Sequence, residues 1–532
     1  MLSEARAISS GMRANGMMRR STLPLAVAVL LLLQMRADIR LFPIWIGWAD
    51  QLRYIRAADA WAAMNFDPLR HHYPPGYALM GALFVHLIPS QPFLVPDLLC
   101  STAALVLFTR VARRLCPAMA YVEVVAAICF VGCTAIGHSS VDLWVVPWTT
   151  TAAAPLIFAC LLLALRYCSS LRPANLVWMA LAAGVCATIR PSDAALVLMV
   201  CSAFCILRLS SARLAPRAVV RHAAALAAGL SVGLLPGIAA HLLVHGWSLG
   251  GYIGGSASMG FEWRLIPFRW VTLVICPRPL FPQGMGMAAV FVWLLPGFAG
   301  MGLVVSGAQS RPAFANALVA ATVCAYWAMY LSYRDLEPFG LWRFNNVHYF
   351  KWTFPFLGLW AIDWARAWVQ PGARRRAALA SAAAALLLCW RPEFVPQAHG
   401  TESTDGMRGA VPGGMQPINH VFMLPVLGRW LPLYFHETTL RVDGETFRNT
   451  SDFKIFPTPS GAMLMPLRPL PAGDATIVLG EGLTLPPRAD WVSGSARLVF
   501  GVPCLVTPHS QACKVRDDIM HPPEPPMPPG KS

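Results

Sequence analysis

The first polar stretch of the chain concentrates side chains that are suited to acid–base and phosphate chemistry. In WADQLRYIRAADAWAAM, residues Asp50, Arg53, Tyr54 and Ala57 recur at i, i+3, i+4 and i+7, the spacing of one helix face. That face presents a carboxylate, a guanidinium and a phenol in one direction. A carboxylate so placed could take a proton as a general base, and arginine is suited to bidentate contacts with phosphate.

The same segment also fits a simpler interpretation. An amphipathic helix on the outer membrane surface would direct its arginines, Arg53 and Arg56, toward lipid phosphates. The residues of this stretch alone leave both interpretations open, and both place the helix at a membrane surface.

Composition excludes an ordinary soluble globular protein. Of the 532 residues, 56% are hydrophobic and only 13% are charged, which indicates a polytopic membrane protein. The net charge of +16 could suggest a nucleic-acid partner, but only four of the 42 basic residues are Lys, and many arginines cluster between apolar runs. These clusters are better explained as topology signals, so no nucleic-acid partner is expected.

The chain contains about 11 apolar runs of a length near the roughly 20 residues that cross a bilayer. They lie at 17–35, 93–109, 120–137, 147–167, 175–190, 191–208, 221–244, 286–307, 313–332, 347–365 and 376–391. The first is expected to be an uncleaved signal anchor, because no convincing cleavage site follows it to make it a cleaved signal peptide. Segment 76–88 is too short to cross, and it is expected to be re-entrant or interfacial.

Arginine clusters near 6–20, 110–114, 208–221 and 366–376 mark one side of the membrane, which the positive-inside rule assigns to the cytoplasm. The loops 36–92, 138–146, 245–285 and 333–346 then face outward, as does everything after residue 391. Pro191 predicts a helix break in TIRPSDA, which places Arg190 and Asp193 at the outer boundary. Arg190 has two candidate roles there, phosphate binding and a structural pair with Asp193.

The chain changes character after the last span. Residues 1–391 form the expected membrane module, followed by a linker over 392–416 and a small β-rich extracytoplasmic domain over 417–518. Stretches such as TTLRV, ATIVLG and ARLVFGVPCLVT predict strands. The Pro-rich tail 519–532 is expected to be disordered. An oxidising outer compartment would favour a disulfide between Cys504 and Cys513.

Several segments, in this order, resemble the GT-C superfamily of membrane glycosyltransferases, which includes protein O-mannosyltransferases and lipid A aminoarabinose transferases. A hydrophobic anchor precedes DQLRYIRAA, HHYPPGYALMGALF follows, and HSSVDLWVV and LWRFNNVHYFKWTF come later. The resemblance covers roughly the first 390 residues. It implies an all-α polytopic fold of the GT-C type, with a polyprenyl-phosphate sugar as donor and a glycan, lipid or protein as acceptor, in a bacterial inner membrane with a periplasmic C-terminal domain.

The resemblance also implies roles for individual residues. Asp50 matches the acidic residue that follows the first span in the superfamily, and it is the expected catalytic base. The expected substrate-binding residues, most of them cationic and suited to the donor phosphate, are Arg53, Tyr54, Arg56, Tyr73, Asp142, Arg190, Arg343, His348 and Lys351. Gln51 stands beside Asp50 where several relatives have a second acid, which argues against a metal-dependent mechanism. No cofactor is therefore expected.

Two other classes of function remain as alternatives. A transporter or flippase would place its charged residues near the bilayer midplane, between repeated halves. In this sequence the charged residues are concentrated in the outer loops, and no internal repeat is found. A scaffold whose C-terminal domain does the binding would not need about 11 spans. The adjacent His71 and His72 are expected to diverge and not to share a metal ion.

Overall fold

The computed structural model describes much of the chain between residues 49 and 500. The described residues are 49–89, 91–117, 119, 121–133, 144, 147–212, 215–263, 265–275, 286–305, 313–333, 336, 347–369, 375–379, 381, 390–397, 408–411, 420–424, 439–448, 452–458, 461–466, 468–471, 473–478 and 492–500. Several predictions fall outside them: the anchor 17–35, Asp142, Arg343, the disulfide of Cys504 and Cys513, and the tail 519–532.

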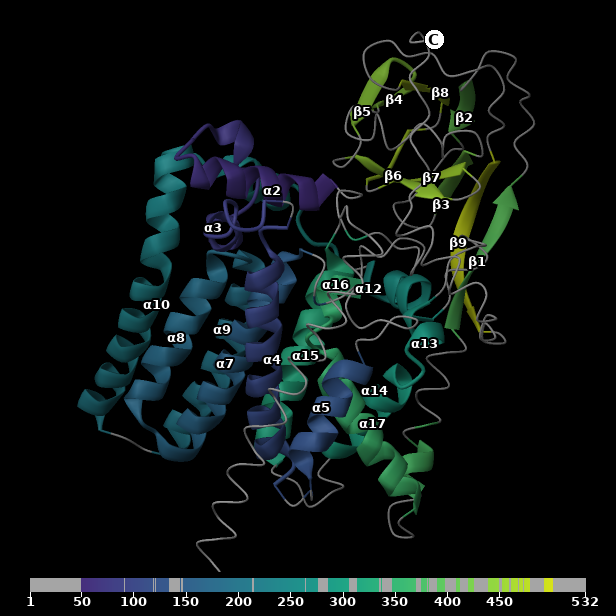
Figure 1. Ribbon diagram of the computed structural model, residues 1–532. Coiled ribbons are helices and arrows are strands. Elements are labelled where there is room, and N and C mark those ends of the chain that lie inside the picture. Colours follow the sequence, from purple (N-terminus) through teal and green to yellow (C-terminus); the bar gives the residue numbers. More distant parts are fainter. Residues whose placement is uncertain are drawn as a thin grey trace, which may run out of the picture. The chain divides into compact units, whose positions relative to one another are not determined.

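The chain divides into two compact units. Unit 1 comprises 1–254, 293–327 and 348–382, and unit 2 comprises 255–292, 328–347 and 383–532. The described part of unit 1 is helical (Figure 1). Its elements are α2 (Ala49–Ala62), η1 (Pro68–Arg70), α3 (Pro75–Ala82), α4 (Leu94–Leu115), α5 (Val122–Gly132), α7 (Thr149–Ser170), α8 (Pro173–Ala187), α9 (Pro191–Ser211), α10 (Pro216–His245), α14 (Leu294–Val305) and α17 (Phe354–Val369). Three further helices belong to unit 1 only in part, because a unit boundary falls within each: α11 (Gly250–Met259), α15 (Ala313–Ser332) and α16 (Val347–Phe350).

Among the described residues, five helices are long and apolar enough to cross a membrane: α4, α7, α9, α10 and α15. The protein is therefore a multi-pass membrane protein, as its composition predicts. Helices α5, α8 and α14 are apolar but shorter, so the finer prediction of about 11 spanning helices is only partly matched. Segment 76–88 overlaps α3, whose eight residues are too few to cross a bilayer, and its interfacial place stays a prediction.

Prolines account for several helix boundaries. Pro173, Pro191 and Pro216 stand at the start of α8, α9 and α10, where the missing N–H costs no intrahelical bond. The predicted break before Pro191 is confirmed. Two runs predicted as continuous helices, 286–307 and 347–365, are instead divided into α13 (Met287–Val290) with α14, and α16 with α17. Pro296 and Pro355 lie in the first turns of α14 and α17. A helix that continued through either proline would lose a backbone hydrogen bond, because proline has no N–H donor.

Glycines bring α8 and α10 into backbone contact. A Cβ atom on Gly229 would lie 2.1 Å from the carbonyl oxygen of Val177, and one on Gly233 would lie 2.5 Å from that of Leu181. Small residues permit such close approach in membrane helices, where the packing itself drives association. This contact holds α10 against α8, and the far end of α10 packs under α2 and α3 through Ala240 and Val244.

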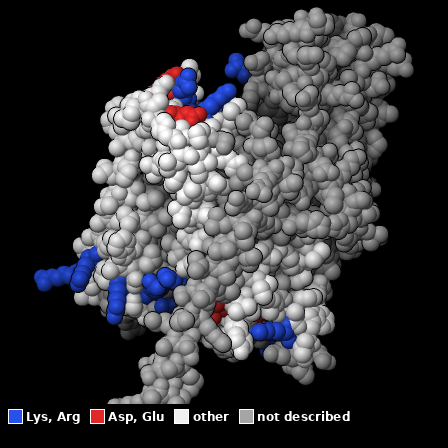
Figure 2. Space-filling model, in the orientation of Figure 1, with Lys and Arg blue, Asp and Glu red and all other residues white. Residues whose placement is uncertain are grey.

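Basic side chains gather at the end of the helices opposite α2 (Figure 2). Helices α4 and α9 carry arginines near their C-terminal ends, and α10 carries arginines near its start. The described members of this group include Arg110, Arg113, Arg114, Arg208, Arg217 and Arg221. By the positive-inside rule, this end is predicted to face the cytoplasm and α2 the outer side.

Unit 2 combines short helical segments with two antiparallel sheets. Its helical segments are α12 (Leu265–Arg269), the π-helical η2 (Trp270–Ile275) and α13. The strand orders are β1-β9-β3-β7-β6 and β2-β8-β4-β5. The strands are β1 (Trp390–Gln397), β2 (Arg408–Val411), β3 (His420–Leu424), β4 (Thr439–Val442), β5 (Glu445–Arg448), β6 (Phe453–Thr458), β7 (Gly461–Pro466), β8 (Gly473–Val478) and β9 (Val492–Phe500).

Strands β4, β8 and β9 coincide with three stretches predicted as strands. Asp443 and Gly444 join β4 to β5 with positive φ angles of 47° and 85°, as a two-residue hairpin turn requires. Strands β1 and β2 lie within 392–416 or begin just before it, a range predicted as a linker. Pairing with β9 and β8 orders these segments, and local composition does not reveal such partners.

The α8–α10 contact predicts a site-specific effect of a single methyl group. Gly233→Ala should lower the stability by about 1–3 kcal/mol, because the new Cβ atom overlaps the backbone of α8. Gly302→Ala in α14 is the matched control, since nothing lies within 4 Å of the added atom. It should be neutral or slightly stabilising. Thermal unfolding in detergent measures both, and equal melting temperatures for the two variants would contradict the packing.

The arrangement of charges predicts which cysteine substitutions react from outside the cell. Met64, 71% exposed after α2, should be labelled as Met64→Cys by a membrane-impermeant maleimide. The exposed Ala215, between α9 and α10, should not react as Ala215→Cys until the membrane is permeabilised. Reaction of residue 215 in intact cells, above the background of the unsubstituted protein, would reverse the orientation.

Candidate active site

The N-terminus of α7 is the centre of a buried polar cluster in unit 1. Three consecutive threonines, 149–151, open this helix, whose N-cap residue Trp148 supplies no capping side chain. The first N–H groups of a helix lack intrahelical acceptors, and this end carries the positive end of the helix dipole. Each threonine hydroxyl contacts a different nitrogen: Thr149 accepts from Arg190 at 3.0 Å, Thr150 meets His348 at 3.3 Å, and Thr151 accepts from Lys351 at 2.5 Å.

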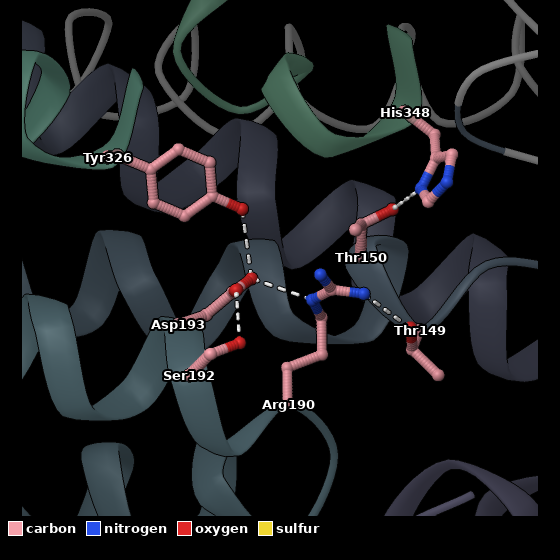
Figure 3. A network of polar contacts seen from close by, with 7 residues as sticks. All are labelled: Thr149, Thr150, Arg190, Ser192, Asp193, Tyr326 and His348. Atoms are coloured by element: carbon pink, nitrogen blue, oxygen red, sulfur yellow. Dashed lines mark hydrogen bonds and ion pairs between the residues drawn. The ribbon is translucent and has the colours of Figure 1, made fainter. Parts of the chain in front are cut away.

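Arg190 lies just before α9 and is 6% exposed. Its Nε donates to Asp193 Oδ2 at 2.8 Å, and Tyr326 donates to the same oxygen at 2.9 Å (Figure 3). Ser192 donates to the other carboxylate oxygen at 3.4 Å. The structural pair with Asp193 is thus present. It directs the guanidinium at Thr149, so pairing and a role toward substrate are compatible.

Lys351 is fully buried in the turn between α16 and α17. Its Nζ lies 4.9 Å from the centroid of the Trp144 ring, a cation–π distance. Asp97 on α4 interacts with it electrostatically. Both oxygens of Asp97 accept from the hydroxyl of Tyr77 at 2.9 Å, so this buried carboxylate has the polar partners that its position in a span requires.

His348 stacks on Trp148, with ring centroids 3.8 Å apart and an interplanar angle of 6°. The indole N–H groups of Trp144 and Trp148 are buried, and neither meets an acceptor among the residues that the structure describes. An unsatisfied buried donor costs about 1–3 kcal/mol. Such donors beside two buried cations favour an anionic occupant.

Asp50, in the first turn of α2, accepts a hydrogen bond of 2.5 Å from Tyr73. Arg53 Nη1 lies 4.0 Å from the same oxygen, and the Asp50 side chain is 42% exposed. Burial raises the pKa of Tyr73, and the nearby Tyr54 and Asp50 raise it further. Tyr73 therefore stays a phenol at neutral pH and donates to the carboxylate.

Tyr54 and Gln51 join Asp50 to the α7 cluster. Tyr54 hydrogen-bonds Thr149, interacts electrostatically with both Asp50 and Arg190, and its ring centroid lies 4.7 Å from that of Tyr73. Gln51 is fully buried, and its Nε2 donates to the carbonyl of Pro147 at 3.0 Å. Gln51 and Tyr54, one turn apart on α2, thus fix this helix against Pro147 and Thr149.

Gly76 fixes the start of α3 against the turn that precedes α9. Its N–H donates to the carbonyl of Thr188 at 2.8 Å, and a Cβ atom here would lie 2.4 Å from the Thr188 hydroxyl. Pro74 and Pro75 lead into α3 without a backbone donor that would need a partner. The segment 73–76 therefore packs against the turn that carries Arg190.

The structure thus brings together Asp50, Arg53, Tyr54, Tyr73, Arg190, His348 and Lys351 in unit 1. Arg56 is exposed on α2, off the face that bears Asp50, while Asp142 and Arg343 lie outside the described residues. His71 and His72 diverge as predicted: His71 contacts the carbonyl of Asn65 at 2.7 Å, and His72 contacts Arg53 at 3.5 Å.

Sequence reasoning missed Gln51 as an anchor, Tyr326 as a partner of Asp193, and the three threonines of α7. Only the threonines carried a local signal, because hydroxyl residues at the start of an apolar run are typical of a helix N-terminus. Within the described ranges, no group of three or more His, Cys, Asp or Glu side chains is placed to hold a metal ion.

Neither the protein-family models nor the curated proteins contain a match to this chain.

The buried pair predicts a large effect of Asp193→Asn on stability. The variant leaves Arg190 without its carboxylate, and breaking a buried pair from one side costs about 3–5 kcal/mol. Ser192→Ala is the matched control, since it removes only the long hydrogen bond to the same side chain. The melting temperature should fall clearly for the first variant and little for the second. Similar melting temperatures would show that Arg190 does not depend on this pair.

Proposed function

We propose that the protein is an integral membrane glycosyltransferase of the GT-C type. It moves a sugar from a polyprenyl-phosphate carrier to an acceptor at the periplasmic face of a bacterial inner membrane. The observation that carries this proposal is the convergence of Arg190, His348 and Lys351 on the N-terminus of α7, beside the carboxylate of Asp50.

The α7 cluster is suited to the phosphate of the donor. Two buried cations, the positive end of a 22-residue helix and two indole N–H groups that meet no acceptor among the described residues all favour a negative charge. Bidentate contacts of arginine with phosphate are strong and directional, and they are stronger still where water is excluded. When the bond between the sugar C1 and the phosphate oxygen breaks, the electron pair stays on that oxygen, and these groups stabilise the charge.

Asp50 is suited to act on the acceptor. Its exposed side chain can reach a hydroxyl that enters from the outer surface. As that hydroxyl oxygen forms a bond to the sugar C1, its proton passes to the Asp50 carboxylate. Tyr73 holds the carboxylate in place through its short hydrogen bond. The products are the glycosylated acceptor, the polyprenyl phosphate and a protonated Asp50, which returns its proton to water.

A transporter or flippase for a lipid-linked substrate is the second candidate. The buried Lys351 and Asp97, at the level where helices break, also fit a substrate path through a bundle. The Asp50–Tyr73 pair at the outer end, whose carboxylate is 42% exposed, favours chemistry over passage. Release of free polyprenyl phosphate together with a glycosylated product distinguishes the two, because transport leaves the lipid-linked sugar intact.

Asp50→Asn is expected to reduce sugar transfer by a factor on the order of 10² or more, because it removes the base but preserves the shape of the side chain. Asp59→Asn is the matched control, an exposed aspartate farther along α2. The measurement follows transfer of sugar from the lipid-linked donor that co-purifies with the protein, identified by mass spectrometry. Near-normal transfer by Asp50→Asn would reject the role of Asp50.

Lys351→Met is expected to weaken the binding of undecaprenyl phosphate, used as the probe, by at least tenfold. The substitution removes the ammonium group and keeps the length of the side chain. Arg110→Gln is the control and should bind normally, because Arg110 is exposed and lies at the end of α4 that is far from Asp97. Native mass spectrometry in detergent reports the bound fraction. Equal binding by both variants would reject the phosphate site, even if Asp50 proved essential.

A further inference from the structure

The basic end of unit 1 contains a hollow between four of the five long apolar helices. Its volume is about 580 Å³, and its walls come from α4, α7, α9 and α15. The polar lining consists of Arg113, Arg114, Ser169 and Arg208, and the apolar lining includes Leu165 and Phe314. Of the described residues that line it, none is acidic.

The hollow lies where these four helices end. Helix α4 ends at Leu115, α7 at Ser170 and α9 at Ser211, while α15 begins at Ala313. Each of the four is 20 to 22 residues long, which matches the thickness of the hydrocarbon core. The hollow is therefore at the level of lipid headgroups, at the end opposite α2.

Each arginine of the hollow has a polar partner on a neighbouring helix. Arg114 Nη1 donates to Ser169 Oγ at 3.3 Å, and Arg208 Nε donates to the carbonyl of Cys168 at 3.0 Å. Each of these bonds uses only one of the five N–H donors of its guanidinium. Arg113 forms an ion pair with Glu123. The described lining of the hollow thus holds three cations and no carboxylate, a charge that fits a phosphodiester.

The surroundings of the hollow favour a lipid over a soluble anion. Phe314 on its wall is 41% exposed, and Pro117, Leu165 and Ala315 add to its apolar lining. A phosphate held by the arginines would therefore have apolar side chains beside it for the lipid chains. Basic pockets between transmembrane helices commonly hold anionic headgroups.

We propose that this hollow binds the headgroup of an anionic phospholipid from the leaflet at the basic end, and that the lipid links α4, α7, α9 and α15. The site is separate from the α7 cluster and does not depend on the proposed transfer reaction.

The test compares three probes on the purified full-length protein in detergent: phosphatidylglycerol, phosphatidylcholine and inorganic phosphate. Phosphatidylglycerol should bind and raise the melting temperature, whereas the two others should not. In the double variant Arg114→Gln/Arg208→Gln, retention of phosphatidylglycerol in native mass spectra should fall at least tenfold. The matched control Arg217→Gln/Arg221→Gln removes two exposed arginines at the same end but outside the hollow, and it should retain the lipid.

Equal lipid retention by the two double variants would overturn the proposal, and so would stabilisation by inorganic phosphate alone, which would make the hollow a small-anion site. If the first double variant does not fold, Ala315→Phe serves in its place. Ala315 lines the hollow, so the larger ring fills the space and keeps all three arginines. Loss of the lipid from this variant supports the site, and full retention overturns it.

Discussion

The burial of two cations at the positive end of a helix is the constraint on which the rest of unit 1 depends. Arg190 and Lys351 are 6% and 0% exposed, and an unpaired buried charge costs several kcal/mol. Asp193 and Asp97 offset part of this cost, and the threonines of α7 accept from both cations. Because the α7 dipole adds to the positive potential, a bound anion stabilises the arrangement further. A charge cluster of this kind fits the phosphate site that we propose.

The surrounding elements hold these groups where they are. The break before Pro191 puts Arg190 at the end of a helix rather than within one, and the turn before Pro355 does the same for Lys351. A hydrogen bond from Gly76 joins α3 to the turn before Arg190, and one from Gln51 joins α2 to the residues before α7. The first turns of α2 and the buried cluster are consequently linked, and Asp50, with its side chain 42% exposed, lies beside the groups that we propose to hold the donor phosphate.

Local sequence patterns predicted part of this. Apolar runs indicated a multi-pass membrane protein, Pro191 indicated the helix break, and the helical spacing placed Asp50 and Tyr54 on one face. Arg190, His348 and Lys351, grouped as phosphate contacts, do lie around one helix end, although their binding of phosphate stays a prediction. The partners of these residues could not be read from the chain, because His348 and Lys351 meet their threonines across 198 and 200 positions. The strands β1 and β2 in the expected linker likewise depend on distant partners.

The central claim is that the N-terminus of α7 holds the phosphate of a polyprenyl-phosphate donor. A cryo-electron microscopy map of the full-length protein with undecaprenyl phosphate tests it most directly. The account predicts density for the phosphate within hydrogen-bonding distance of Arg190, Lys351 and the first backbone N–H groups of α7, with the lipid chain leaving toward the membrane. Phosphate density elsewhere in the protein, with the α7 cluster unchanged and empty, would contradict it.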